Sequence, residues 1–329
     1  MTDALLRVDG LKKFFTLSDG QRVHAVDDVS FSLSSGETLG LVGESGCGKS
    51  TLGRTIIRLL SPDAGTVHVN GKNLARLSDK ELKPLRREIQ MIFQDPYASL
   101  NPRSTVGRAI EEPLIVHGVK DPRARAARVS WLLERVGLPS EAAQRHPHEF
   151  SGGQRQRIGI ARALALNPKL IICDEPVSAL DVSVRAQVLN LLADLREELG
   201  LSYLFISHDL SVVEHFCDRV AVMYLGRIVE LAPRHKLWSQ PLHPYTHTLL
   251  DAAPLPDPTR RRGRRTLVEG EIPNPIDRPN GCHFHTRCVH KIPICSSVAP
   301  PLISRADDHQ VACHRAEDFY TPIPKETYV

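Results

Sequence analysis

The chain has 329 residues, enough for one large domain with an extension or for two domains of ordinary size. Its net charge of +4 is modest and aromatic residues are few, so composition does not call for nucleic acid as a partner. No stretch approaches the roughly 18 to 20 consecutive apolar residues of a membrane-spanning helix, and the N-terminus lacks a signal-peptide pattern. We therefore expect a cytosolic protein whose seven cysteines serve packing, reactivity or metal binding rather than disulfides.

The first 33 residues alternate short apolar runs with turns, and the runs at residues 5–8, 21–26 and 29–33 have the pattern of strands. Phe14 and Phe15 lie at the end of the first strand region. Such residues usually belong to a core, but if a nucleotide is bound, one of them can stack on its base. We assign that role to Phe15.

Residues 43–51 form a glycine-rich loop that fits the phosphate-binding pattern G-x-x-x-x-G-K-[ST] without a mismatch. An apolar run precedes it and a helical pattern follows to Leu60, so strand, loop and helix occur in the required order. Glycines let the backbone N–H groups converge on phosphate oxygens, Lys49 adds a positive charge, and Ser50 can ligate Mg²⁺. A chance glycine turn is the alternative, and these flanks disfavour it. The residues expected to bind a nucleotide triphosphate, besides Phe15, are Gly43, Glu44, Ser45, Gly46, Cys47, Gly48, Lys49, Ser50 and Thr51.

The middle of the chain changes from strands to helices. Residues 66–69 and 89–93 have strand patterns, and Asn70-Gly71 predicts a hairpin turn between strands. From residue 106 to 136 apolar residues recur at helical spacing, and another helix begins after Ser151. We therefore expect an inserted helical subdomain over about residues 98–165.

An apolar strand at residues 170–173 is followed directly by Asp174 and Glu175. Continuous apolar runs of this length are typical of strands buried on both faces in parallel sheets, where chemistry lies at the carboxyl ends. A helix over 182–199 and a strand over 203–206 follow, and His208 comes just after that strand. The sequence thus predicts an α/β fold with two acidic residues and a histidine at one edge of the sheet.

In chain order, the motifs are residues 43–50, Gln94, residues 151–154, Asp174-Glu175, residues 178–181 and His208. Together, in this order, they resemble those of the ATP-binding subunit of an ABC transporter, and the resemblance covers nearly all of residues 1–250. The resemblance implies a P-loop NTPase fold of the ABC ATPase type, with an antiparallel β subdomain, a helical signature subdomain and a small irregular cysteine-rich C-terminal extension. We expect a nucleotide-binding domain over residues 1–253, followed by a linker and the extension over 254–329. The basic run at 260–265 is expected to be a solvated linker, with contact to anionic lipid as the alternative.

The resemblance also implies a role for each motif. It makes Glu175 the general base for ATP hydrolysis, with His208 and Gln94 as further catalytic residues, and it places Mg²⁺ on Ser50, Gln94 and Asp174. The family's signature motif would contact the ATP of a partner subunit; Phe150 stands where leucine is usual. The signature residues are Ser151, Gly152, Gly153 and Gln154, and those of the D-loop are Ser178 and Asp181.

Two tail segments, residues 240–246 and 281–288, look like those of oligopeptide/dipeptide permease ATPases, the second most like the F-type subunit. This implies a peptide importer at the cytoplasmic face of the inner membrane, attached peripherally and without bound nucleic acid. The implied partners are a second, D-type ATPase in a heterodimer, two transmembrane permease subunits and, indirectly, an extracytoplasmic solute-binding protein. Nickel importers share much of this tail, so nickel or another solute is an alternative. A soluble ABC ATPase outside transport is disfavoured, because such proteins usually have two cassettes or a long coiled coil.

Four cysteines lie close together in the tail, in a proline-rich segment with little apolar content of its own. They are Cys282, Cys288, Cys295 and Cys313. Such a segment needs a cross-link, and the residues leave open Zn²⁺, an iron–sulfur cluster or no ligand. The spacing lacks the C-x2-C pairs usual for structural zinc, and the resemblance to peptide-permease ATPases implies a [4Fe–4S] cluster. We expect a cluster with a structural role, with Zn²⁺ as the alternative.

Overall fold

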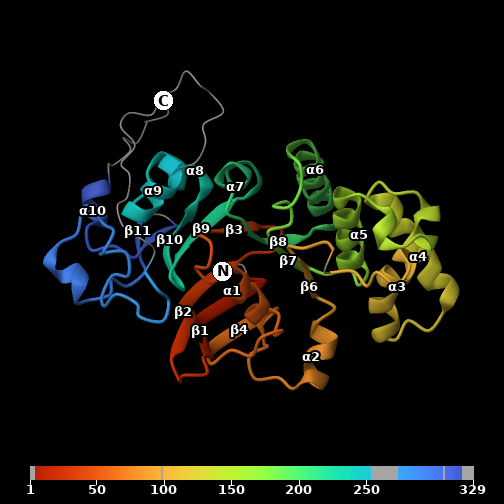
Figure 1. Cartoon of the computed structure of the whole chain (residues 1–329), viewed down its shortest axis with the longest axis horizontal. Helices are drawn as coiled ribbons and strands as arrows, with labels where there is room; N and C mark the ends of the chain where they lie inside the picture. The colour runs from red at the N-terminus through yellow and green to blue at the C-terminus, as the bar shows by residue number, and fades with distance from the viewer. Residues whose placement is uncertain (1–3, 98, 253–272, 307, 321–329) are drawn as a thin grey trace, which may run out of the picture.

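The computed structural model describes residues 4–97, 99–252, 273–306 and 308–320. Two β-sheets organise these residues (Figure 1). The larger sheet has eight strands in the order β11-β12-β10-β9-β3-β8-β7-β6, and the smaller has four in the order β2-β1-β4-β5. The strands are β1 (Leu6–Thr16), β2 (Arg22–Leu33), β3 (Thr38–Val42), β4 (Ala64–Val69), β5 (Lys72–Asn73), β6 (Ile89–Ile92), β7 (Leu170–Asp174), β8 (Ser202–Ile206), β9 (Arg219–Tyr224), β10 (Arg227–Pro233), β11 (Ile303–Ala306) and β12 (His309–Val311).

Helices lie around and between the two sheets. Three of them, α3 to α5, follow one another between β6 and β7 and form the right-hand part of the molecule in Figure 1. The α-helices are α1 (Lys49–Ile56), α2 (Asp79–Leu85), α3 (Val106–Val116), α4 (Pro122–Arg135), α5 (Gly152–Leu164), α6 (Val182–Leu199), α7 (Leu210–Phe216), α8 (Arg234–Ser239), α9 (Pro244–Ala252) and α10 (Ala316–Phe319). The 3₁₀ helices are η1 (Ser140–Gln144), η2 (Pro147–Glu149) and η3 (Pro293–Ser296).

The centre of the large sheet is parallel and fully buried. Every residue of β3, β7 and β8 is buried, which explains their continuous apolar sequences. β3 pairs in parallel with β8 and β9, and β7 pairs in parallel with β6 and β8, with Asp174 opposite Ile206. The carboxyl ends of these strands therefore meet at one edge, and the loops that follow them are brought together there.

Helix α1 is packed between the two sheets. It contacts β1 and β2 on one side and β7 and β8 on the other. Leu52 and Ile56 of α1 are fully buried in a core that also contains residues of β1, β3 and β8. The helix that begins at the glycine-rich loop is thus held from both sides by apolar contacts.

The described residues after 272, which we call the C-terminal extension, contribute two strands to the large sheet. β12 pairs antiparallel with β10, placing Val311 opposite Glu230, and β11 pairs antiparallel with β12. The expected start of the linker at residue 254 and the basic run at 260–265 lie outside the described residues. None of the described helices combines the length and apolarity needed to cross a lipid bilayer.

The structure differs from the expected elements in three places. The first helix ends at Ile56 rather than Leu60, because Arg58 adopts a left-handed backbone conformation with φ of 60°. Two strands expected between residues 21 and 33 are one strand, β2, in which Asp28 has a left-handed backbone. Strand β10, at residues 227–233, was not recognised, although its pairing with β9 is regular over most of its length.

Candidate functional site

The glycine-rich loop connects β3 to α1, as the sequence predicts. Gly48 is the residue before the helix and has φ of 108°, and a Cβ atom there would lie 1.9 Å from the carbonyl oxygen of Ala25. Only glycine fits this position. Lys49 is buried, and its Nζ donates to the carbonyl oxygens of Gly43 at 2.8 Å and Glu44 at 3.0 Å. The lysine charge is therefore held inside the loop, where phosphate oxygens are expected to bind.

Ser50 and Asp174 meet across the first turn of α1 and the end of β7. The Ser50 hydroxyl donates to Oδ1 of Asp174 at 2.7 Å. The Asp174 side chain is fully buried, and its Oδ2 accepts no hydrogen bond, with Arg54 the nearest cation at 3.6 Å. Burial raises the pKa of Asp174, against the opposing effects of Ser50 and Arg54. An unsatisfied buried carboxylate oxygen beside a hydroxyl fits a hard divalent cation such as Mg²⁺.

The other two predicted catalytic residues, Gln94 and His208, both contact Glu175. Its Oε2 accepts from Nε2 of Gln94 at 3.0 Å and lies 3.2 Å from Nδ1 of His208. Glu175 has a left-handed backbone with φ of 46°, and its N–H donates to the carbonyl of Ile206 at 3.0 Å. This unusual conformation turns the side chain after β7 toward the other two residues. Gln94, Glu175 and His208, which lie far apart in the sequence, are brought into contact.

The signature residues cap a helix. Ser151 Oγ accepts from the N–H of Gln154, and the Gln154 side chain accepts from the N–H of Ser151, so the two residues form a capping box at the start of α5. A Cβ atom on Gly153 would lie 2.3 Å from a methyl group of Val184, which explains the glycine. Figure 1 shows α5 to one side of α1, so the residues at the start of α5 lie apart from the glycine-rich loop before α1.

The predicted D-loop begins three positions after Glu175, at Ser178. Both the N–H and the hydroxyl of Ser178 donate to the carbonyl oxygen of Glu175, at 3.2 and 3.0 Å, and Asp181 is the residue before α6. Phe15 is 38% exposed near the end of β1, with Nζ of Lys13 5.6 Å from the centre of its ring. Its neighbour Phe14 instead packs against His24. An exposed ring of this kind is available for stacking.

Sequence reasoning gave no role to three residues that contact the site. Arg54, on α1, lies next to Asp174. Tyr245, at the start of α9, and Arg287, in the extension, contact the backbone and the carboxylate of Glu44. Tyr245 and Arg287 belong to the tail segments used for the family resemblance, but nothing in their spacing predicts contact with Glu44, which lies 201 and 243 positions earlier.

The four late cysteines line one small cavity, together with His243, Phe284 and other residues. Burial raises the pKa of Cys282 to about 11, that of Cys313 to about 12, and that of Cys288. Within the described ranges, no three histidine, cysteine, aspartate or glutamate side chains are grouped closely enough to hold a metal ion.

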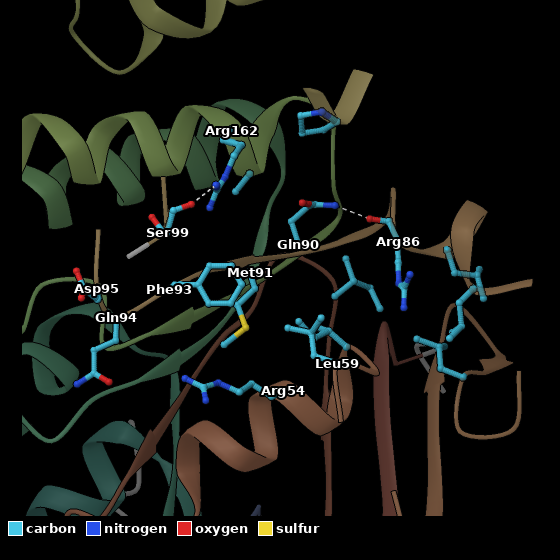
Figure 2. A pocket seen from close by; sticks show the side chains of 17 residues that line it. Arg54, Leu59, Arg86, Gln90, Met91, Phe93, Gln94, Asp95, Ser99 and Arg162 are labelled. Atoms are coloured by element: carbon cyan, nitrogen blue, oxygen red, sulfur yellow. Dashed lines mark hydrogen bonds between the residues drawn. The ribbon is translucent and has the colours of Figure 1, made fainter. Parts of the chain in front are cut away.

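A groove with a volume of about 590 Å³ lies beside Gln94, between α1, α2, β6 and α5. Figure 2 shows its middle formed by Met91, Phe93 and Leu59, with Arg54, Arg86 and Arg162 around it. Leu59 is 54% exposed. Arg162 donates to the carbonyl oxygen of Ser99 across one end.

Comparisons with known proteins agree with this geometry. A family model described as "ABC transporter" matches residues 26–178, and one described as "Oligopeptide/dipeptide transporter, C-terminal region" matches residues 229–295. The chain is 55% identical over 323 residues to the oligopeptide transport ATP-binding protein AppF of Bacillus subtilis, covering 95% of this chain and 97% of AppF. It is 58% identical over 282 residues to the glutathione import ATP-binding protein GsiA of Salmonella choleraesuis, covering 84% of this chain and 45% of GsiA.

Among solved structures, the dimeric post-hydrolysis state of the ATP-binding cassette MJ0796, bound to ADP and phosphate, is similar with a TM-score of 0.64. The match has 31% identity and covers 70% of this chain and 98% of that one. Fold, phosphate-binding loop and both family models thus agree. The chain belongs to the ATP-binding subunits of ABC transporters, in the oligopeptide/dipeptide transporter family, and its enzymatic activity is ATP hydrolysis.

Proposed function

We propose that this subunit energises the import of di- and oligopeptides, working at the cytoplasmic face of the cell membrane. The observation that supports the catalytic part is the contact of Gln94 and His208 with Glu175, which directly follows the buried Asp174 that accepts from Ser50. The peptide substrate is supported by the match to the oligopeptide/dipeptide C-terminal family and by the relative AppF, whose name describes oligopeptide transport.

The proposed catalytic roles depend on which oxygen of Glu175 already has a hydrogen-bond partner. Gln94 and His208 both approach Oε2 of Glu175, which leaves Oε1 to take a proton from the attacking water. A His208 proton on Nδ1 suits that contact, since the carboxylate is an acceptor. Mg²⁺ would be held by Ser50 and Asp174, with Gln94 nearby, and would supply positive charge to the phosphates. Lys49, already directed into the loop, would then bind the β- and γ-phosphates.

The remaining ATP contacts are proposed to be the N–H groups of residues 43–51 and the ring of Phe15. Because the signature lies apart from this loop, we propose that Ser151, Gly152, Gly153 and Gln154 contact ATP bound to a second ATPase subunit. Ser178 and Asp181 would lie at the same interface. A D-type subunit in a heterodimer is the expected partner.

We propose that the groove beside Gln94 receives a segment of one transmembrane permease subunit. Its apolar centre suits apolar side chains, and its arginines suit acidic or carbonyl groups at the ends of such a segment. Gln94 lines the groove and also donates to Glu175. A segment bound in the groove would therefore be separated from the catalytic carboxylate only by the Gln94 side chain.

We propose further that Cys282, Cys288, Cys295 and Cys313 bind a [4Fe–4S] cluster with a structural role. Their common cavity supports this proposal. A single Zn²⁺ needs sulfur donors at about 2.3 Å from one point. Among the described side chains no group that could hold a metal ion is found, so the proposal rests on the shared cavity and on the family resemblance. Bound iron would also stabilise the thiolates against the raised pKa values of these cysteines.

Anaerobic purification tests the cluster. The protein should be brown, absorb near 400 nm as expected for thiolate-ligated iron, and contain iron and sulfide. Cys288→Ser should lose the colour, whereas Cys217→Ser, at a buried position in the main core, should keep it. Stoichiometric zinc without iron would make zinc the ligand, and absence of both would leave the cysteines unligated.

For the domain organisation, we propose a nucleotide-binding domain over residues 1–253, with a helical signature subdomain over about 98–165, and a linker and extension over 254–329. The helices α3 to α5 support the subdomain. The strands β11 and β12 show that the extension is attached by sheet pairing as well as by the chain.

The substrate is tested by reconstituting the subunit with its co-purifying membrane partners in vesicles. ATP-dependent uptake of labelled dipeptides is expected, with Glu175→Gln as the inactive control. Uptake of Ni²⁺ or another solute in place of peptides would support the alternative within the same subfamily. Co-purification with ribosomal RNA rather than with membrane proteins would instead support a non-transport ABC ATPase.

A further inference from the structure

Arg287 of the C-terminal extension forms a two-pronged ion pair with Glu44 of the glycine-rich loop. Nη1 donates to Oε2 at 2.9 Å and Nη2 donates to Oε1 at 3.0 Å. The Arg287 side chain is only 8% exposed and that of Glu44 22%. A bidentate pair at this depth fixes both the distance and the orientation of the two groups, and losing either partner leaves a poorly solvated charge.

Glu44 is held by its backbone as well. Its N–H donates to the hydroxyl of Tyr245 at 2.8 Å, and its carbonyl oxygen accepts from Nζ of Lys49 at 3.0 Å. Tyr245 also packs against the rings of Tyr224 and Phe284. The second residue of the loop is thus fixed by α9 and the extension on one side, and is bonded to the phosphate-binding lysine on the other.

Arg287 is itself held by a compact turn. The N–H of Arg287 donates to the carbonyl oxygen of Phe284 at 3.0 Å, and the N–H of His285 donates to the carbonyl oxygen of Cys282 at 3.0 Å. Phe284 is 2% exposed and belongs to the main core. The guanidinium also lies about 6 Å from the rings of Tyr224 and Phe284. Its position therefore depends on the folded extension.

We propose that Arg287 is a positioning residue for ATP binding, acting through Glu44 to keep the glycine-rich loop and Lys49 in the conformation that accepts phosphates. On this proposal the extension contributes to the nucleotide site without touching the nucleotide. Removing Arg287 should mainly weaken ATP binding and leave the hydrolytic step intact, because Gln94, Glu175 and His208 are held by other elements.

The test compares full-length Arg287→Ala, Arg287→Lys and Glu44→Gln with the wild type. We expect the ATP dissociation constant to rise about tenfold in Arg287→Ala, an effect in the usual range for lost charge-assisted hydrogen bonds. Arg287→Lys keeps the charge without the bidentate geometry, so it should lie in between. In the assembled transporter, KM for ATP should rise while kcat changes little.

One control variant and one further measurement distinguish a positioning role of Arg287 from general destabilisation of the protein. Arg305→Ala removes an arginine of the same extension that pairs with the exposed Glu317, and should bind ATP normally. The increase in melting temperature produced by saturating ATP should shrink in Arg287→Ala but not in Arg305→Ala.

The double variant Arg287→Ala/Glu44→Gln tests whether Arg287 acts through Glu44, because both changes remove the same ion pair. It should bind ATP no more weakly than the worse single variant. Additive losses would show that Arg287 does not act through Glu44 and would overturn the proposal. Wild-type ATP affinity in Arg287→Lys and Glu44→Gln would overturn it as well, even if Arg287→Ala did not fold.

Discussion

The ATP site and the C-terminal extension use charged groups in opposite ways. At the site, His208 is 57% exposed and Glu175 is held at one carboxylate oxygen only, so both remain available to substrate. In the extension's junction with the sheet, Glu230 is completely buried and accepts from the backbone of Leu242 and His243 and from the side chains of Thr246 and His309. The Glu175 carboxylate is therefore left incompletely paired, whereas both oxygens of the Glu230 carboxylate, which joins segments of the chain, accept hydrogen bonds.

The largest effect is expected at Glu175, because this residue is the proposed general base. Its substitution tests the role of the incompletely paired carboxylate at the ATP site. Glu175→Gln keeps the hydrogen bond capacity of the side chain but cannot take the proton of water, so kcat should fall roughly 10³-fold. ATP binding should persist, since Ser50, Asp174 and Lys49 are unchanged. The measurement is single-turnover ATP hydrolysis in the assembled transporter alongside ATP binding. Near-normal turnover would show that another group activates water.

Glu230→Ala tests how much the fully paired, buried carboxylate contributes to stability. The change leaves four donors from β12, α9 and the loop before it without their buried acceptor, and should lower the free energy of unfolding by about 3 kcal/mol. Urea unfolding measures this loss. Glu317→Ala, which removes the exposed partner of Arg305 in the same extension, should cost less than about 1 kcal/mol. Equal losses in the two variants would contradict the idea that the buried network joins the extension to the sheet.

Much of the nucleotide site was predictable because its signals are local. The loop at 43–51 fits a contiguous pattern, and its flanking strand and helix are confirmed by β3 and α1. The parallel strands β7 and β8 were predicted from continuous apolar runs, because burial on both faces requires them. The family resemblance is confirmed by both family models and by AppF.

The contacts between distant segments were not predictable from the same signals. Arg287 is an ordinary arginine in a proline-rich segment, and Glu230 is one acidic residue in an unrecognised strand. Their partners are 243 and 79 positions away in the sequence. The Glu230–His309 pair depends on how β12 adds to the sheet, and the Arg287–Glu44 pair depends on how the extension packs against the glycine-rich loop. No periodicity or spacing within one segment predicts either pairing.

Lys49→Ala tests whether the loop depends on its own charge as well as on the extension. The lysine is buried against loop carbonyls, and its charge has no substitute within the loop, so ATP affinity should fall about 100-fold through loss of strong charge-assisted bonds to phosphate. Isothermal titration with ATP gives the value, and Lys72→Ala at an exposed position of β5 is the control. A loss no larger than that of Arg287→Ala would mean that loop geometry matters more than the lysine charge.

The smallest effect concerns Asp27, which joins β2 to β10 and the extension through Arg227 and Arg278, both at 2.7 Å. Burial alone would raise the pKa of Asp27, but the hydrogen bonds from Arg278 and Arg227 outweigh it and lower the pKa from 3.8 to about 2. The unfolded chain therefore binds the proton more readily than the folded one. The stabilisation is fully present above about pH 4 to 5 and is lost as the pH falls toward 2.

Asp27→Asn should consequently be less stable than the wild type by about 2 kcal/mol near neutral pH, and the difference should shrink as the pH falls below 4. Urea unfolding of both proteins at several pH values measures this, with Asp9→Asn at an exposed pair with Arg7 as the control. A stability difference that stays constant down to pH 3 would show that Asp27 contributes by packing or neutral hydrogen bonds rather than by its charge. In that case the junction with the extension would depend on Glu230 far more than on the arginine pair, and acid would loosen the extension only through other groups.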